Sequence, residues 1–79
     1  MWIEDQDGAW HNSEYIVNLE IISDAFESSI LATNIKNDIS ELFKFKGVYA
    51  QEDAKSKLRD IMHHISGEEH VIDKDGDII

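Results

Sequence analysis

The sequence contains no cysteine and no proline, and it has few positive charges. The absence of cysteine excludes disulfides, thiolate metal sites and cysteine nucleophiles, and it predicts a reducing, cytoplasmic location. Met1, Trp2 and Ile3 are followed directly by Glu4 and Asp5, so we expect no signal peptide. No apolar run is long enough to cross a bilayer, and the sequence therefore predicts no membrane insertion.

Acidic residues outnumber basic ones by 17 to 7, which gives a formal net charge of −10. Residues 1–35 contain seven acids and no base, residues 36–59 carry a net charge of +2, and residues 60–79 carry −5. Such a chain repels phosphate backbones and anionic membranes and attracts basic proteins. The sequence therefore predicts a protein partner with a basic surface and no direct binding to nucleic acid. Ordinary solvated surface charge is the alternative explanation.

The chain length limits the kind of function. A chain of 79 residues is about half the usual length of a domain, so we expect one domain over residues 1–79 without a large internal cavity. Hydrophobic residues make up 42% of the chain and charged residues 30%, which is typical of globular proteins and not of disordered acidic tails. A binding module with a modest core is expected.

Two segments near the N-terminus predict strands. Trp2 and Trp10 flank a turn in which Asp7-Gly8 supplies the positive φ that a tight hairpin needs. Residues 15–22 alternate with a period of two, which places Tyr15, Val17, Leu19 and Ile21 on one face of a strand.

Residues 29–46 are ambiguous. They read as two strands, 29–35 and 39–46, and in the second Ile39, Glu41, Phe43 and Phe45 would share one face. The alternative is a helix, because Leu31, Ile35, Ile39, Leu42 and Phe43 also fall at helical spacing and Asp38 with Glu41 resembles a capping box. We favour strands, so that residues 1–46 are mainly β.

A helix is predicted over residues 51–66. Ala54, Leu58, Ile61, Met62 and Ile65 form one apolar stripe at helical spacing. Residues 68–79 follow as a short acidic hairpin or tail around a second Asp-x-Asp-Gly turn. The predicted fold is α+β, a small antiparallel β-meander packed by one C-terminal amphipathic helix.

The acidic end of the chain has one candidate cation site. Asp73, Asp75 and Asp77 lie around Gly76 in a pattern similar to the start of a calcium loop. An EF-hand needs glycine where this chain has Ile78, and it needs an acid at position 12, which lies beyond residue 79. A glycine-containing β-turn therefore explains the pattern better.

Other reactive groups are sparse. His63 and His64 point about 100° apart on a helix, and His70 lies beyond Gly67, so the spacing gives zinc little support. There is no Gly-x-Ser-x-Gly elbow and no phosphate-binding glycine loop. We therefore expect no enzyme, no cofactor and no metal.

The opening Met1-Trp2-Ile3, the Asp7-Gly8-x-Trp10 turn, the isoleucine-rich strand and the helix that follows Gln51-Glu52-Asp53-Ala54 resemble small bacterial and phage-borne orphan proteins. In those proteins a β-meander is closed by one amphipathic helix. The resemblance covers most of residues 1–65 and implies an α+β fold and a non-catalytic role. It implies no site residues.

Together these features predict an acidic protein-binding module, of the kind that a phage or mobile element uses to inhibit or regulate a basic, nucleic-acid-handling host protein. In this hypothesis exposed carboxylates occupy the places of phosphates, and aromatic side chains add apolar contacts. The alternatives are a structural subunit that self-associates, as a homodimer, through an exposed sheet edge and, less favoured, a small metal-binding protein. The predicted partner-binding residues are Asp5, Asp7, Glu14, Glu20, Glu27, Trp2, Trp10 and Phe26.

Overall fold

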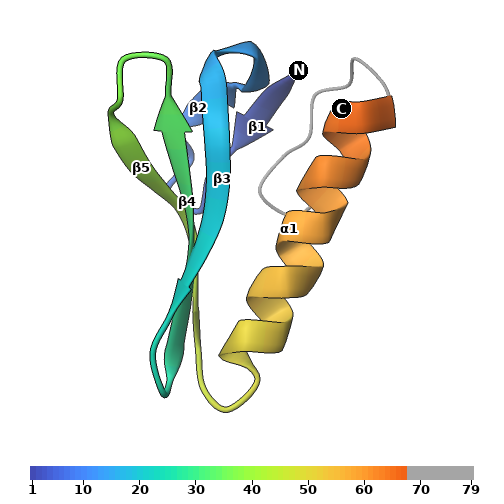
Figure 1. Cartoon of the computed structure of the whole chain (residues 1–79). Helices are drawn as coiled ribbons and strands as arrows, with labels where there is room; N and C mark the ends of the chain where they lie inside the picture. Colours follow the sequence, from blue (N-terminus) through green and yellow to red (C-terminus); the bar gives the residue numbers. More distant parts are fainter. Residues whose placement is uncertain (68–79) are drawn as a thin grey trace.

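The computed structural model describes residues 1–67 of the chain. Within them an N-terminal hairpin and a short 3-10 turn are followed by three long strands and a helix (Figure 1). The predicted acidic hairpin or tail at 68–79 lies outside the described residues. The elements are β1 (Trp2–Glu4), β2 (Trp10–Asn12), η1 (Ser13–Tyr15), β3 (Ile16–Ser23), β4 (Glu27–Asn34), β5 (Ile39–Lys46) and α1 (Ala50–Gly67).

The strands form two antiparallel sheets. β1 pairs with β2, while β3, β4 and β5 form a meander with β4 in the centre. α1 packs on one face of the meander, in contact chiefly with β4 and β5. The α+β prediction is confirmed, and residues 29–46 are strands, because Ile30 and Ala32 of β4 and Phe43 of β5 contribute to the buried core beneath α1.

Each hairpin turn is built on one Asp or Asn side chain. Asp5 Oδ1 accepts hydrogen bonds from the backbone N–H groups of residues 7 and 9, Asp24 Oδ1 from those of 26 and 27, and Asn34 Oδ1 from those of 36 and 38. Such local bonds satisfy backbone donors that the strands leave unpaired at a turn. Gly8 and Asn37 supply the positive φ angles in the first and third turns.

The core lies between α1, the inner face of the meander and the N-terminal hairpin. Ile30 of β4 and Ile61 of α1 are almost fully buried, and Ile3 brings β1 into the same cluster. Burying side chains of this size stabilises a fold by about 1.5–3 kcal/mol each, so these three residues define the packing of the chain. Met62, which the sequence placed in the helix stripe, is instead exposed.

Two β-bulges change the faces predicted from alternation. In β3 the register passes from Ile16 opposite Asn34 to Asn18 opposite Thr33, so Val17 is an extra residue and is 61% exposed. Ile16, not Val17, packs against the core. A single extra residue reverses the alternation that precedes it, and the predicted face was therefore wrong at this end of β3.

The second bulge is in β5. The register passes from Ile30 opposite Phe43 to Leu31 opposite Glu41, which leaves Leu42 as the extra residue. Leu42 and Phe43 are consequently both buried, although they are neighbours in the sequence. The prediction that Ile39 and Glu41 share a face with Phe43 was wrong for this reason.

Candidate protein-binding surface

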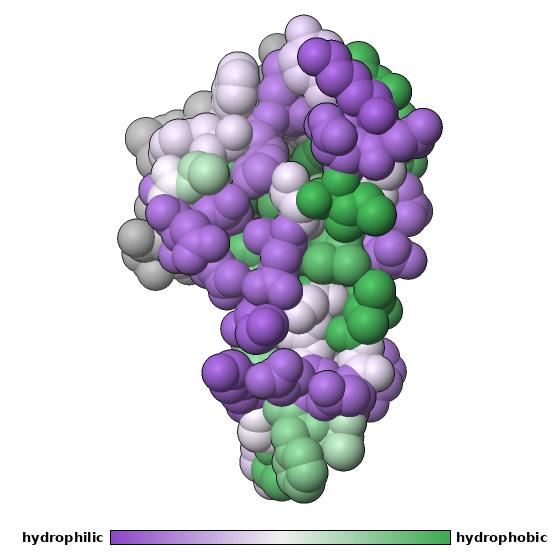
Figure 2. Space-filling view, turned by 90° about the vertical axis from the view of Figure 1, so that its left-hand side faces the viewer, coloured by the Kyte–Doolittle hydropathy of each residue, from purple (hydrophilic) through white to green (hydrophobic). Residues whose placement is uncertain are grey.

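The face of the meander that points away from α1 carries an apolar stripe. Leu31 of β4 lies in its centre, directly paired with Glu20 of β3 and Glu41 of β5. Ile22 of β3 and Ile39 of β5 lie diagonal to Leu31, opposite Ser29 and Thr33, and are 55% and 63% exposed. Figure 2 shows hydrophobic side chains running down this side of the molecule beside hydrophilic ones. We call this surface, with Ile22, Leu31 and Ile39 at its centre, the outer face. Patches of this kind mark interaction sites on globular proteins.

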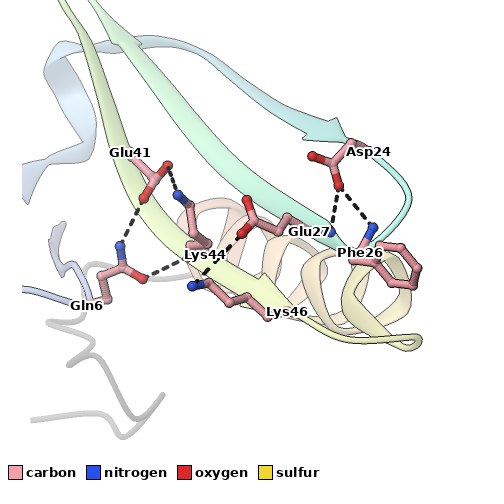
Figure 3. Close-up of polar contacts among 7 residues, drawn as sticks. All are labelled: Gln6, Asp24, Phe26, Glu27, Glu41, Lys44 and Lys46. Carbon is pink, nitrogen blue, oxygen red and sulfur yellow. Dashed lines mark hydrogen bonds and ion pairs between the residues drawn. The ribbon is translucent and has the colours of Figure 1, made fainter.

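Charges on the outer face are distributed unevenly between its two edges. On the β5 side Lys44 Nζ lies 3.9 Å from Glu41 Oε2, and Lys46 Nζ lies 3.9 Å from Glu27 Oε1 (Figure 3). Among the residues that the structure describes, Glu20 on β3 has no such ion pair. The β5 side is therefore close to neutral, and the β3 side is acidic.

A second apolar cluster lies at the tip of the meander. Phe26 in the β3–β4 turn and Val48 and Tyr49 before α1 are 66%, 79% and 67% exposed. The backbone N–H of Gly47 donates to the carbonyl oxygen of Phe26 over 2.8 Å, which ties the two loops together. We call Phe26, Val48 and Tyr49 the tip cluster. Hydrophobic atoms also gather at this end of Figure 2.

The two tryptophans lie on the N-terminal hairpin. Trp2 pairs with Asn12 and Trp10 with Glu4, so both indoles project from the face of the hairpin opposite Ile3. Both are exposed, whereas Ile3 is buried. The hairpin is thus held by one apolar side chain and presents two aromatic ones outward.

Asp5 differs from the other predicted carboxylates because it is buried, with 5% of its surface exposed. Its Oδ2 lies 2.8 Å from His11 Nε2, and its Oδ1 accepts the backbone N–H groups of Asp7 and Ala9. Burial alone would raise the pKa of the Asp5 carboxyl, but these hydrogen bonds outweigh it and hold the pKa below its ordinary value. Asp5 therefore stabilises the turn and is not positioned to contact a partner.

The predicted binding residues do not form one patch. Glu20 and Glu27 lie on the outer face, with Phe26 at its tip, whereas Trp2, Trp10 and Asp7 belong to the hairpin. Glu14 lies on η1, just before β3. Sequence reasoning missed Ile22, Ile39, Val48 and Tyr49. The available signal was that Ile22 shares a face with Asn18 and Glu20 in the alternation of β3.

Other kinds of site find little support in residues 1–67. His11 and Asp5 form a histidine–carboxylate pair, but Asp5 is engaged in the hairpin turn. In this part of the chain no three His, Asp or Glu side chains converge as a metal site would require. No helix among the described residues combines the length and the apolar character needed to cross a membrane.

No family model matches the chain, and the searches of curated proteins and of solved structures likewise found no match.

Proposed function

We propose that the chain is a non-catalytic protein-binding module whose partner carries a basic surface. The observation that supports this most is the outer face, where large apolar side chains are exposed on a three-stranded sheet; the tip cluster lies at the end of the same meander. Interfaces draw most of their binding energy from a few large apolar anchors surrounded by polar side chains. Ile22, Leu31 and Ile39 are suited to be such anchors.

The charge of the chain supports a basic partner. Asp7, Glu14 and Glu20 are exposed and come from the segment that contains no base. Exposed carboxylates steer encounter with Lys and Arg patches, and they make association faster at low salt. A partner that normally binds nucleic acid would offer such patches, so mimicry of phosphates belongs to this proposal. The phage or mobile-element origin of such an inhibitor remains a prediction.

Affinity capture with the immobilised full chain tests the proposal. Proteins held at low salt and eluted with salt would be compared with those captured by an outer-face variant, Ile22→Ser with Ile39→Ser. The matched control is Tyr15→Ser with Ile35→Ser, whose side chains are similarly exposed at 55% and 58%. We expect the outer-face variant alone to lose the captured protein. Equal capture by both variants would contradict the proposed surface.

Self-association is the alternative function, and one observation favours it. In the described part of the chain β3 pairs with β4 alone, which leaves its other edge unpaired. Sedimentation equilibrium at low and high salt distinguishes the two functions. A dimer that strengthens with salt supports self-association, because screening removes the repulsion between two acidic chains. A monomer under both conditions rules it out.

A further inference from the structure

The two edges of the meander are treated differently by the rest of the chain. Along β5 the backbone N–H of Gln6 donates to the carbonyl oxygen of Leu42 over 2.9 Å, and Gln6 Oε1 accepts the N–H of Lys44 over 2.8 Å. Gln6 Nε2 donates to Glu41 Oε1, so the side chain lies along the strand (Figure 3). Gln6 therefore caps backbone groups of β5 that another strand would otherwise pair with.

The edge of β3 has no such cover within residues 1–67. β3 is eight residues long and contains neither lysine nor proline, the residues that commonly protect an edge strand. Its ladder with β4 uses one edge, so alternate backbone N–H and C=O groups point away from the sheet. From Asn18 to Ser23, beyond the bulge at Val17, an extended chain laid along this edge would find its hydrogen-bonding partners already aligned.

A groove of about 330 Å³ adjoins this edge on the side of α1. Ile16, Val17 and Leu19 of β3 form one wall and Met62 and Ile65 of α1 form the other. The side chains of an added strand would alternate between this groove and the outer face. Because the groove is lined mainly by apolar residues, an added strand should carry apolar side chains at every second position.

The charges near the edge of β3 indicate which side chains an added strand would carry at the positions that face away from the groove. The charged residues of β3 and its flanking turns are Glu14, Glu20 and Asp24, all of them acids. A second copy in antiparallel pairing would bring six carboxylates to one seam without a base, and like charges across strands are destabilising. A basic strand would instead place Lys or Arg beside Glu20, the one charged residue of β3, with Glu14 and Asp24 beyond the two ends of the strand. Charge complementarity therefore favours a basic strand over a second copy.

We propose that β3 accepts an extended segment of the partner protein as an additional antiparallel strand, with alternating apolar and basic side chains. This inference rests on the proposed function and states how the basic partner binds. The apolar side chains occupy the groove between β3 and α1, and the basic ones lie beside Glu20. Backbone hydrogen bonds provide affinity and the two sets of side chains provide specificity, as in other cases of strand addition.

A synthetic peptide of about ten residues that alternates Lys and Val is the probe, because it covers the length of β3 with the required pattern. NMR titration of the full chain should show shift changes confined to β3, Met62 and Ile65. Hydrogen exchange of alternate β3 amides should slow. Binding should weaken as salt rises from about 50 to 500 mM.

Matched peptides separate strand addition from simple charge attraction. Methylating alternate backbone amides of the peptide removes the donors that would pair with β3 and leaves its charge intact, so affinity should fall about tenfold or more. Replacing Lys by Glu should abolish binding. An equally charged peptide with scrambled order should bind weakly and without slowing exchange in β3.

Protein variants locate the groove. Met62→Lys places a charge on the groove wall and should weaken peptide binding about tenfold. Ile35→Lys adds the same charge at an exposed position in the β4–β5 turn and should change peptide binding less than about twofold. Both side chains are exposed, so both variants should fold, which circular dichroism would verify.

Several outcomes would overturn strand addition. Tight binding of the N-methylated peptide would do so, as would a salt-strengthened dimer that protects β3, or a peptide that does not bind at all. If the peptide shifts Leu31 and Ile39 and leaves the β3 amides unprotected, strand addition fails and the proposed function stands. Capture that is lost in the outer-face variant likewise supports the proposed function independently of any peptide result.

Discussion

Asp5 shows how a single side chain can determine the N-terminal hairpin. Its carboxylate accepts hydrogen bonds from two backbone N–H groups of the turn and lies 2.8 Å from His11 on β2. These hydrogen bonds satisfy the buried carboxylate, which would be costly to bury without partners. The hairpin in turn places Ile3 in the core.

Asp5→Ala should lower the free energy of unfolding by about 1–3 kcal/mol, because it removes the acceptor of two backbone N–H groups of the turn and the partner of His11. Asp7→Ala is the matched control, since Asp7 is exposed and its substitution should change stability by less than about 0.5 kcal/mol. Urea denaturation of both variants provides the measurement. Similar midpoints would contradict the role given to Asp5.

The stability of the chain should fall at acid pH. The pKa of Asp5 is held low by its hydrogen bonds against the opposing effect of burial, and the pKa of Asp24 is lowered by the backbone N–H groups of Phe26 and Glu27. Carboxylates with lowered folded-state pKa values stabilise the native state above their unfolded-state pKa, about 3.9 for Asp. This contribution is lost as pH falls through the folded-state pKa.

Urea midpoints measured from about pH 6 down to pH 2 should therefore decrease below about pH 4. Asp24→Asn should flatten the decrease, because it removes one of the two groups with a lowered pKa. Asp38→Asn provides an exposed comparison on the β4–β5 turn. An unchanged pH profile in Asp24→Asn would show that the Asp24 carboxylate of the β3–β4 turn does not contribute to the pH dependence of stability.

At the scale of elements, helix α1 is held by the few side chains that reach the core. Ile61 is almost fully buried, while its neighbour Met62 is 49% exposed. Ile61→Ala should cost about 2–5 kcal/mol in unfolding free energy, the usual range for a buried large-to-small change. Met62→Ala should cost much less, and thermal denaturation of the pair would test the assignment. Equal losses would mean that α1 packs on a different face.

Gln6 links the N-terminal hairpin to the edge of β5. Gln6→Ala removes the side-chain acceptor of the Lys44 N–H and the donor to Glu41, while the backbone bond to Leu42 is retained. We expect faster hydrogen exchange at the Lys44 amide and a loss of stability of about 1 kcal/mol. The control is Gln51→Ala, because Gln51 is an exposed residue of α1. Unchanged exchange at Lys44 would show that Gln6 does not protect this edge.

The order and type of the elements could be predicted from periodicity, but the faces of two strands could not. Val17 and Leu42 are bulge residues, and each has an apolar residue on one side, Ile16 or Phe43, so the sequence does not show which residue of the apolar pair is the extra one. The role of Asp5 was also hidden. An aspartate before Asp7-Gly8 reads as surface charge until the hairpin closes and brings His11 to within 2.8 Å.

The candidate site was predictable in kind and only partly in position. Acidity follows from composition, but the exposure of Trp2, Trp10 and Phe26 does not, because large aromatic side chains in so short a chain are expected first in the core. Which large apolar side chains stay outside depends on the single helix, because α1 covers one face of the meander and leaves Ile22 and Ile39 on the other. Pairing between distant strands determines this, and local sequence does not specify it.

At the scale of the whole molecule, net charge acts on folding as well as on binding. The chain has a formal charge of −10 on 79 residues, so folding brings many like charges close together in a small volume. Self-repulsion of this kind destabilises the compact state, and salt screens it with a Debye length that falls below about 10 Å above 0.1 M. The surface ion pairs of Lys44 and Lys46, each at 3.9 Å, offset little of it.

The free energy of unfolding should therefore rise, on the order of 1 kcal/mol, between about 20 and 500 mM NaCl. Neutralising three exposed acids together, as Asp7→Asn, Glu14→Gln and Glu20→Gln, should raise stability at low salt and reduce its dependence on salt. A variant that removes positive charge instead, Lys36→Gln, should show the opposite change at low salt. Urea titrations at each salt concentration separate these curves. If salt stabilises all three chains equally, screening of the carboxylates is not the cause, because a general salt effect on apolar burial is independent of these charges.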